Sequence, residues 1–101
     1  MILYNITIKV EHSIAGSWKT WMLEEHMPEI LSTGCFNSSR LLRLLEVDDA
    51  DGPTYAAQFT APSGEHYNRY ISTFADGMRK KTLDKWGNRY IAFRSAMELV
   101  D

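Results

Sequence analysis

The order of two hydrophobic patterns along the chain constrains its fold more than any other feature. Apolar and polar residues alternate over residues 2–11, which predicts a strand with one buried face. Apolar residues then recur at helical spacing over residues 14–27. Pro28 ends or restarts this helix, and Thr33-Gly34 is its stop. The chain therefore begins with a strand that is followed by a helix.

The rest of the chain supplies three more strands and a second helix. Residues 35–47 and 54–61 are predicted strands on either side of a turn rich in Asp and Gly. Residues 64–81 form the clearest helix, and residues 89–100 form a last strand. The order β-α-β-β-α-β is typical of the ferredoxin-like α+β fold, in which two helices cover one face of a four-stranded antiparallel sheet. We therefore predict a single domain over residues 1–101.

Composition excludes several classes of protein. The formal net charge of the 101 residues is -2, which argues against a nucleic-acid binder. No apolar run reaches 18 residues, so we expect no membrane span. The single cysteine, Cys35, excludes a disulfide framework and a Cys-based zinc site, and it favours a cytoplasmic location. The sequence lacks the glycine-rich nucleotide-binding motifs and HExxH, so we expect no cofactor.

The three histidines do not have the spacing of a metal site. We place His12 and His66 at one end of the sheet and His26 far along the first helix. No third ligand with motif spacing accompanies His12 and His66, and the prediction is that the chain binds no metal.

The second and fourth predicted strands carry apolar residues on both faces. Leu41 and Leu42 point to opposite sides of their strand, while Ile91 and Phe93 share one face of the last strand. A strand with two apolar faces needs two covers, and a second copy of the chain is the simplest second cover. The sequence therefore favours a homodimer; the alternative is that the leucines of the long hairpin fold back on themselves.

Two local runs and the overall layout carry a resemblance to a known superfamily. The first run is Trp18-x-x-Trp21 followed by Glu25-His26-Met27-Pro28, and the second is Gly34-Cys35-Phe36. Together with the β-α-β-β-α-β order, they resemble the dimeric α+β barrel superfamily. Residues 74–78 and 93–98 more narrowly resemble a family of small uncharacterised bacterial proteins without an established activity.

The resemblance implies a homodimer with a pocket between helices and sheet. The superfamily includes cofactor-free monooxygenases, haem-degrading oxygenases, small isomerases and ligand-binding regulatory domains. It has no universal catalytic signature, and a shared fold is only an analogy for function.

Two neighbouring residues are the candidate catalytic groups. At 100° per residue, Glu25 falls inside the apolar stripe of the first helix, one turn beyond Trp21. It is either a general acid or base, or the partner of a basic residue such as Arg79 or Lys80 at the sheet edge. His26 is either an acid–base group or a boundary histidine that caps the helix end before Pro28.

Five aromatic residues on the two helices are the candidate ligand-binding residues: Trp18, Trp21, Tyr67, Tyr70 and Phe74. They predict either a pocket for an apolar, ring-like molecule or a core built from large side chains. The first possibility indicates a small-molecule binding protein or a cofactor-free enzyme. The alternative function is a non-catalytic dimeric interaction or regulatory module.

Arginines on the second and fourth strands have two interpretations. Arg40, Arg43, Arg89 and Arg94 either bind an anionic ligand, or they form cross-strand pairs and protect the sheet edges. The pattern does not decide whether Arg40 or Arg43 lies on a given face of the second strand, because a bulge would exchange them.

Overall fold

A computed structural model describes residues 1–101 and contains one four-stranded sheet. The strands are β1 (Ile2–Val10), β2 (Ser38–Arg43), β3 (Thr54–Ala61) and β4 (Tyr90–Glu98). They lie in the order β2-β3-β1-β4, and all neighbouring pairs are antiparallel. This arrangement confirms the predicted ferredoxin-like α+β fold.

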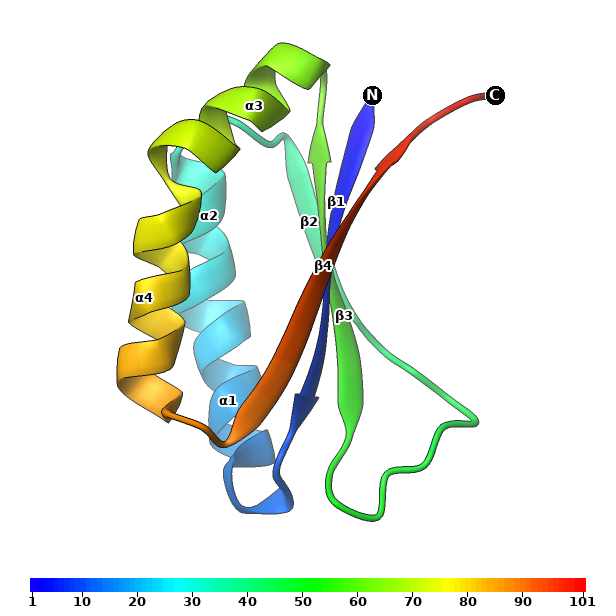
Figure 1. Cartoon of the computed structure of the whole chain (residues 1–101), viewed down its shortest axis with the longest axis vertical. Helices are drawn as coiled ribbons and strands as arrows, with labels where there is room; N and C mark the ends of the chain where they lie inside the picture. Colours follow the sequence, from blue (N-terminus) through cyan, green and yellow to red (C-terminus); the bar gives the residue numbers. More distant parts are fainter.

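The helices all lie on one side of the sheet, as Figure 1 shows. The first helical segment begins with a 3-10 turn, η1 (His12–Ile14), and continues through α1 (Ala15–Trp21). A single π-helical turn, η2 (Met22–His26), joins α1 to α2 (Met27–Ser32). Gly34, with φ of 78°, follows the helix end in the left-handed region that a glycine adopts easily. None of the helices is long and apolar enough to cross a membrane.

The second helical segment is kinked at Phe74, where the sequence predicts one uninterrupted helix. It consists of α3 (Gly64–Thr73) and α4 (Ala75–Trp86). Ser63 caps α3 by accepting a hydrogen bond from the backbone N–H of His66 at 3.3 Å. The backbone N–H of Phe74 still donates a hydrogen bond to the carbonyl oxygen of Tyr70 at 2.8 Å. The segment therefore bends at Phe74 while its helical hydrogen bonding continues.

The π-helical turn keeps one stripe of the first helical segment buried. Buried residues recur every four positions at Ile14, Trp18, Met22, His26 and Ile30. In a regular α-helix, four residues span about 400°, which is about 40° more than one full turn. Side chains spaced by four would therefore move gradually away from the face that meets the sheet. The wider turn of η2 accommodates one extra residue and returns His26 to the face that meets the sheet.

Alternation on β1 separates the two faces of the sheet. Tyr4, Ile6, Ile8 and Val10 are buried against the helices and form the centre of the core. Asn5 lies on the opposite side, which we call the open face, and its amide oxygen accepts a hydrogen bond from Gln58 Nε2 at 3.3 Å. The hydrophobic pattern of the first predicted strand therefore gives the correct buried face.

The open face carries large apolar side chains that are exposed to solvent. Register places Phe93 of β4 opposite Thr7 and Ile91 opposite Lys9, so both lie on this face. Their exposed fractions are 65% and 71%, and Met97 on the same face is also exposed. The prediction of two apolar faces holds only in part for β4: Tyr90 and Ala92 on its helix-facing side pack against the core, but Arg94 and Glu98 lie on the same side.

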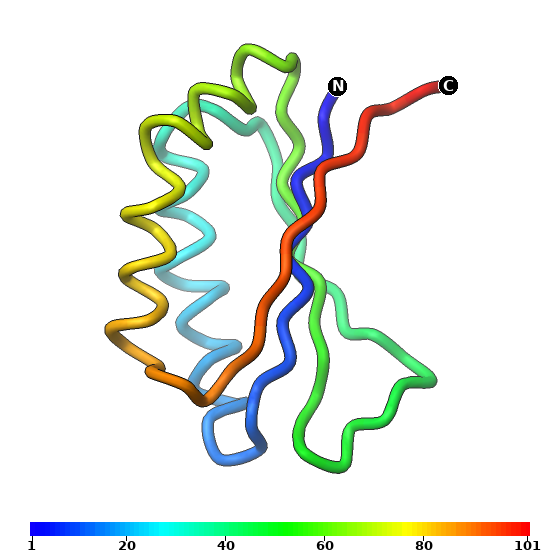
Figure 2. Tube along the Cα trace, viewed as in Figure 1, coloured from blue at the N-terminus to red at the C-terminus, as the bar shows by residue number.

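The strand directions also correct two predicted placements. His12 and His66 lie at opposite ends of the sheet, because β1 and β3 are antiparallel and these residues follow the ends of different strands. In β2, which is shorter than predicted, Arg40 pairs with Gln58 and lies on the open face. Arg43 lies on the other side and forms an ion pair with Asp49 at 3.0 Å. The trace in Figure 2 shows both termini at one end of the sheet and the β2–β3 loop at the other.

Candidate functional site

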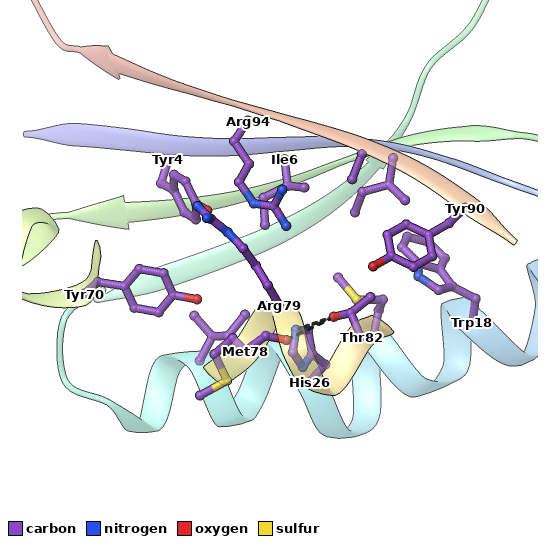
Figure 3. A pocket seen from close by; sticks show the side chains of 14 residues that line it. Tyr4, Ile6, Trp18, His26, Tyr70, Met78, Arg79, Thr82, Tyr90 and Arg94 are labelled. Carbon is purple, nitrogen blue, oxygen red and sulfur yellow. Dashed lines mark hydrogen bonds between the residues drawn. The ribbon is translucent and has the colours of Figure 1, made fainter. Parts of the chain in front are cut away.

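A narrow cavity lies between the helices and the β4 side of the sheet (Figure 3). It measures about 30 Å³. Most of its lining is apolar and comes from β1, the first helical segment and α4, including Ile6, Met22 and Met78. Ala92 is the small residue that β4 contributes to the wall, and its size leaves room beside the larger side chains.

His26 is the buried titratable group of this cavity. Its exposed fraction is 5%, and its ring stacks on Trp21 with centroids 4.4 Å apart. Burial, assisted by the positive charge of Lys81, lowers the pKa of His26 from 6.5 to about 4. The imidazole is therefore neutral at pH 7 and carries one proton on one of its two nitrogens.

The two ring nitrogens of His26 differ in their partners. Thr82 Oγ1 lies 3.2 Å from the carbonyl oxygen of Met78 and 3.3 Å from His26 Nε2. The hydroxyl accepts from Nε2–H in one tautomer of the ring and can donate to Nε2 in the other. In both tautomers His26 Nδ1 is buried and has no hydrogen-bond partner within the chain. An unpaired buried polar atom costs free energy, so a complementary group on a bound molecule would stabilise this site.

Tyr70 and Trp18 supply polar atoms from two other elements of the cavity wall. Burial, followed by the nearby Tyr4, raises the pKa of the Tyr70 phenol, whereas the positive charges of Arg94 and Arg79 oppose this rise. The phenol therefore stays protonated at neutral pH. Trp18 is fully buried, and its indole Nε1–H has no partner.

The cavity brings together only some of the predicted site residues. Trp18, His26 and Tyr70 line it. Trp21 stacks behind His26 and does not border the cavity. Tyr67 packs on Tyr4, and Phe74 packs on Tyr70, so these two rings support the lining from outside.

The placement of Glu25 in the buried stripe is wrong. Its side chain is exposed and lies beside Trp21 and Lys85 in a shallow surface groove, away from the cavity. The helical wheel assumes a uniform 100° per residue, and the π-helical turn breaks that assumption between Met22 and His26. The proposed partners Arg79 and Lys80 pair instead with Asp76 and Asp84.

Sequence reasoning missed several residues of the lining. Thr82 lies beyond the predicted end of the second helix at residue 81, so its contact with His26 was not foreseen. Helical periodicity places Arg79 on the polar side of the second helix, whereas the structure places it in the lining of the cavity. One sequence pattern does group three residues of the lining. Alternation along β4 places Tyr90, Ala92 and Arg94 on the same face of the strand.

No group of three or more His, Cys, Asp or Glu side chains lies close enough together in residues 1–101 to hold a metal ion. The lining of the cavity offers hydrogen-bonding groups, positive charge and apolar contact.

Comparison with known proteins gives a family for the chain. A family model for a domain of unknown function, DUF4286, matches residues 1–100. The chain belongs to the DUF4286 family. No curated protein is significantly similar in sequence to this DUF4286 chain. The family match agrees with the predicted resemblance to small uncharacterised proteins.

Solved structures share the fold of the DUF4286 chain at low sequence identity. A dimeric ferredoxin-like protein from an uncultured marine organism has a TM-score of 0.68 at 13% identity, with 100% of this chain and 96% of that chain covered. An ethyl tert-butyl ether degradation (EthD) family protein from Bacillus halodurans has a TM-score of 0.68 at 10% identity, with 98% and 100% covered.

A variant of SnoaB, a cofactor-independent oxygenase from Streptomyces nogalater, has a TM-score of 0.66 at 10% identity, with 99% and 94% covered. These similarities confirm the fold that the predicted resemblance implies. At such identities they establish the fold alone.

Proposed function

We propose that this DUF4286 protein binds a small, largely apolar molecule with one aromatic ring in the cavity between its helices and β4. The observation that carries the proposal is the unpaired Nδ1 of His26, a buried nitrogen on a neutral ring beside an apolar cavity. A hydroxyl group on the ligand would donate a hydrogen bond to this nitrogen and remove the cost of leaving it unpaired.

The cavity must widen to accept a ring, because about 30 Å³ holds no more than one or two water molecules. Met22 and Met78 line it, and their unbranched thioether side chains change shape easily. A ring that enters the cavity would displace these two side chains.

Binding is the primary role in this proposal, and proton transfer is secondary. A general base works best when its pKa is near the working pH, and burial lowers the pKa of His26 to about 4. A cofactor-free enzyme would need a bound molecule that raises this pKa. Glu25 takes no part in either role, since it lies outside the cavity.

The test uses 4-hydroxybenzyl alcohol as a neutral, single-ring probe and follows the methionine methyl signals by NMR. We expect the methyl groups of Met22 and Met78 to shift in the wild type. We expect His26→Phe, which keeps an aromatic ring and removes the acceptor, to weaken the affinity about tenfold. Glu25→Gln is the matched control, and its affinity should equal that of the wild type. Equal affinity of the wild type and His26→Phe would contradict the proposal.

A second candidate role concerns the open face. Ile91 and Phe93 are large and exposed there, and exposed apolar patches mark interaction sites. A solved structure of the same fold is described as a dimeric ferredoxin-like protein. These observations support the proposal that two copies of this chain pair through their open faces and form a homodimer. Pairing of open faces leaves the cavity on the other side of each sheet free to bind a ligand.

A further inference from the structure

Two arginines converge on the mouth of the cavity. Figure 3 shows the side chain of Arg79 extending from α4 and that of Arg94 extending from β4 into the space between helix and sheet. Both residues line the cavity and both are exposed, so their charges lie where the cavity meets the solvent, which we call its mouth. The register explains Arg94, because it pairs with Ile6 and lies on the helix-facing side of β4.

This positive charge has almost no counter-charge. The lining contains no aspartate or glutamate, although the whole chain has 13 acidic and 11 basic side chains. Arg94 has no carboxylate within 4.0 Å. Arg79 reaches only Asp76 at 3.8 Å, and the Asp76 side chain is 99% exposed, so water screens that pair.

The two arginines would attract an anion to the cavity. Both act electrostatically on the phenol of Tyr70, which is buried, so their charges reach into the cavity. Both arginines are exposed, so water and salt screen part of this attraction, while the apolar lining lies beside them. A guanidinium also presents a planar pair of donors that matches the two oxygens of a carboxylate.

We propose that the ligand of this cavity is an aryl carboxylate, whose carboxylate lies between Arg79 and Arg94 at the mouth while its ring lies inside. This inference rests on the proposed function and adds the chemical class of the ligand. Tyr70, which keeps its proton, can donate a further hydrogen bond to the carboxylate. The apolar lining favours a single ring over a sugar or a nucleotide.

The experiment compares two probes that differ in one group. The first is 4-hydroxybenzoate, and the second is 4-hydroxybenzyl alcohol, which has the same ring and phenol but no charge. Affinities are measured by methionine methyl NMR for the wild type, Arg79→Gln, Arg94→Gln and the double variant. Arg89→Gln is the matched control, because Arg89 is exposed and lies outside the cavity lining.

We expect the wild type to bind 4-hydroxybenzoate at least about tenfold more tightly than the alcohol. Each single variant should lose most of this preference, the double variant should lose all of it, and Arg89→Gln should keep it. Added salt should weaken binding of the carboxylate more than binding of the alcohol.

Two results would overturn the inference in distinguishable ways. Equal binding of both probes by the wild type, or a preference that survives in the double variant, would reject the carboxylate and leave the proposed function standing. Failure of both probes to bind would reject the proposed function and this inference together.

Discussion

The two faces of the same sheet differ in how their aromatic side chains are covered. Phe59 on β3 faces the helices and has an exposed fraction of 0%, whereas Phe93 on β4 lies on the open face with 65% exposed. The helices of the same chain cover the first face. The second face retains exposed apolar area. One small sheet thus provides a core and cavity on one side and an exposed apolar surface on the other.

Strand β4 shows this difference most clearly because it contributes to both faces. Arg94 reaches the cavity mouth from its helix-facing side, and Phe93 next to it points to the open face. Adjacent residues of an edge strand therefore serve two separate proposed interactions. Substitutions on β4 and its neighbours can break one interaction and leave the other in place.

The largest expected effect comes from the buried aromatic ring. Phe59→Ala should lower the free energy of unfolding by about 3–5 kcal/mol, because it removes a fully buried ring and leaves a cavity. Urea denaturation at a fixed protein concentration measures this. Phe93→Ala, measured at a concentration low enough to keep the chain monomeric, should cost less than about 1 kcal/mol. Equal costs for the two substitutions would remove the distinction between the faces.

The next effect concerns pH and belongs to the helix-covered face alone. The pKa of His26 falls from 6.5 to about 4 on folding, so the unfolded chain binds more protons between these values. Stability should therefore be fully present above pH 6.5 and decrease as the pH falls toward 4, by about 3 kcal/mol from this group. The free energy of unfolding of His26→Phe, measured across the same range, should lack this component. A parallel pH dependence in the wild type and in His26→Phe would contradict the buried, neutral imidazole.

An intermediate effect tests the open face. Phe93→Lys places a charge in the centre of the proposed interface and should weaken self-association about 30-fold or more. Sedimentation over a concentration series gives the dissociation constant. Leu83→Lys is the matched control, because Leu83 is an exposed apolar residue on α4, outside the open face. A wild type that stays monomeric at micromolar concentration would contradict the homodimer.

The smallest effect is expected at the ion pair that ends β2. Arg43 and Asp49 lie 3.0 Å apart, but about half of each side chain is exposed. A double-mutant cycle with Arg43→Gln and Asp49→Asn should give a coupling energy below about 1 kcal/mol. A larger coupling energy would mean that the pair of Arg43 and Asp49 stabilises the β2–β3 loop more than a solvent-exposed ion pair can.

The sequence predicts the order of strands and helices well because each strand interior alternates with a clear period. In β1, Tyr4, Ile6 and Ile8 identify the buried face without any structural information. Boundaries are less accurate where local geometry changes. The kink at Phe74 and the extension of α4 to Trp86 depend on packing, which periodicity does not encode.

The candidate site was harder to predict than the fold, for two physical reasons. The π-helical turn places His26 on the buried face of the helix and leaves Glu25 exposed. The hydrophobic periodicity of the sequence does not locate such a turn. Alternation along β4 places Arg94 and Ala92 on the same face of the strand, but it does not show whether that face meets the helices. The pairing of β4 with β1 determines this. The spacing predicts Trp18 and Tyr70 on buried helix faces, whereas it places His26 outside the apolar stripe, next to Glu25.

The most direct test of the two-sided arrangement is a single NMR experiment on methionine methyl groups. Met22 and Met78 line the cavity, and Met97 lies on the open face. We predict that adding 4-hydroxybenzoate shifts the signals of Met22 and Met78, and that diluting the protein shifts the signal of Met97. A probe that shifts Met97 and leaves Met22 and Met78 unchanged would contradict the proposal that the helix-covered cavity is the binding site.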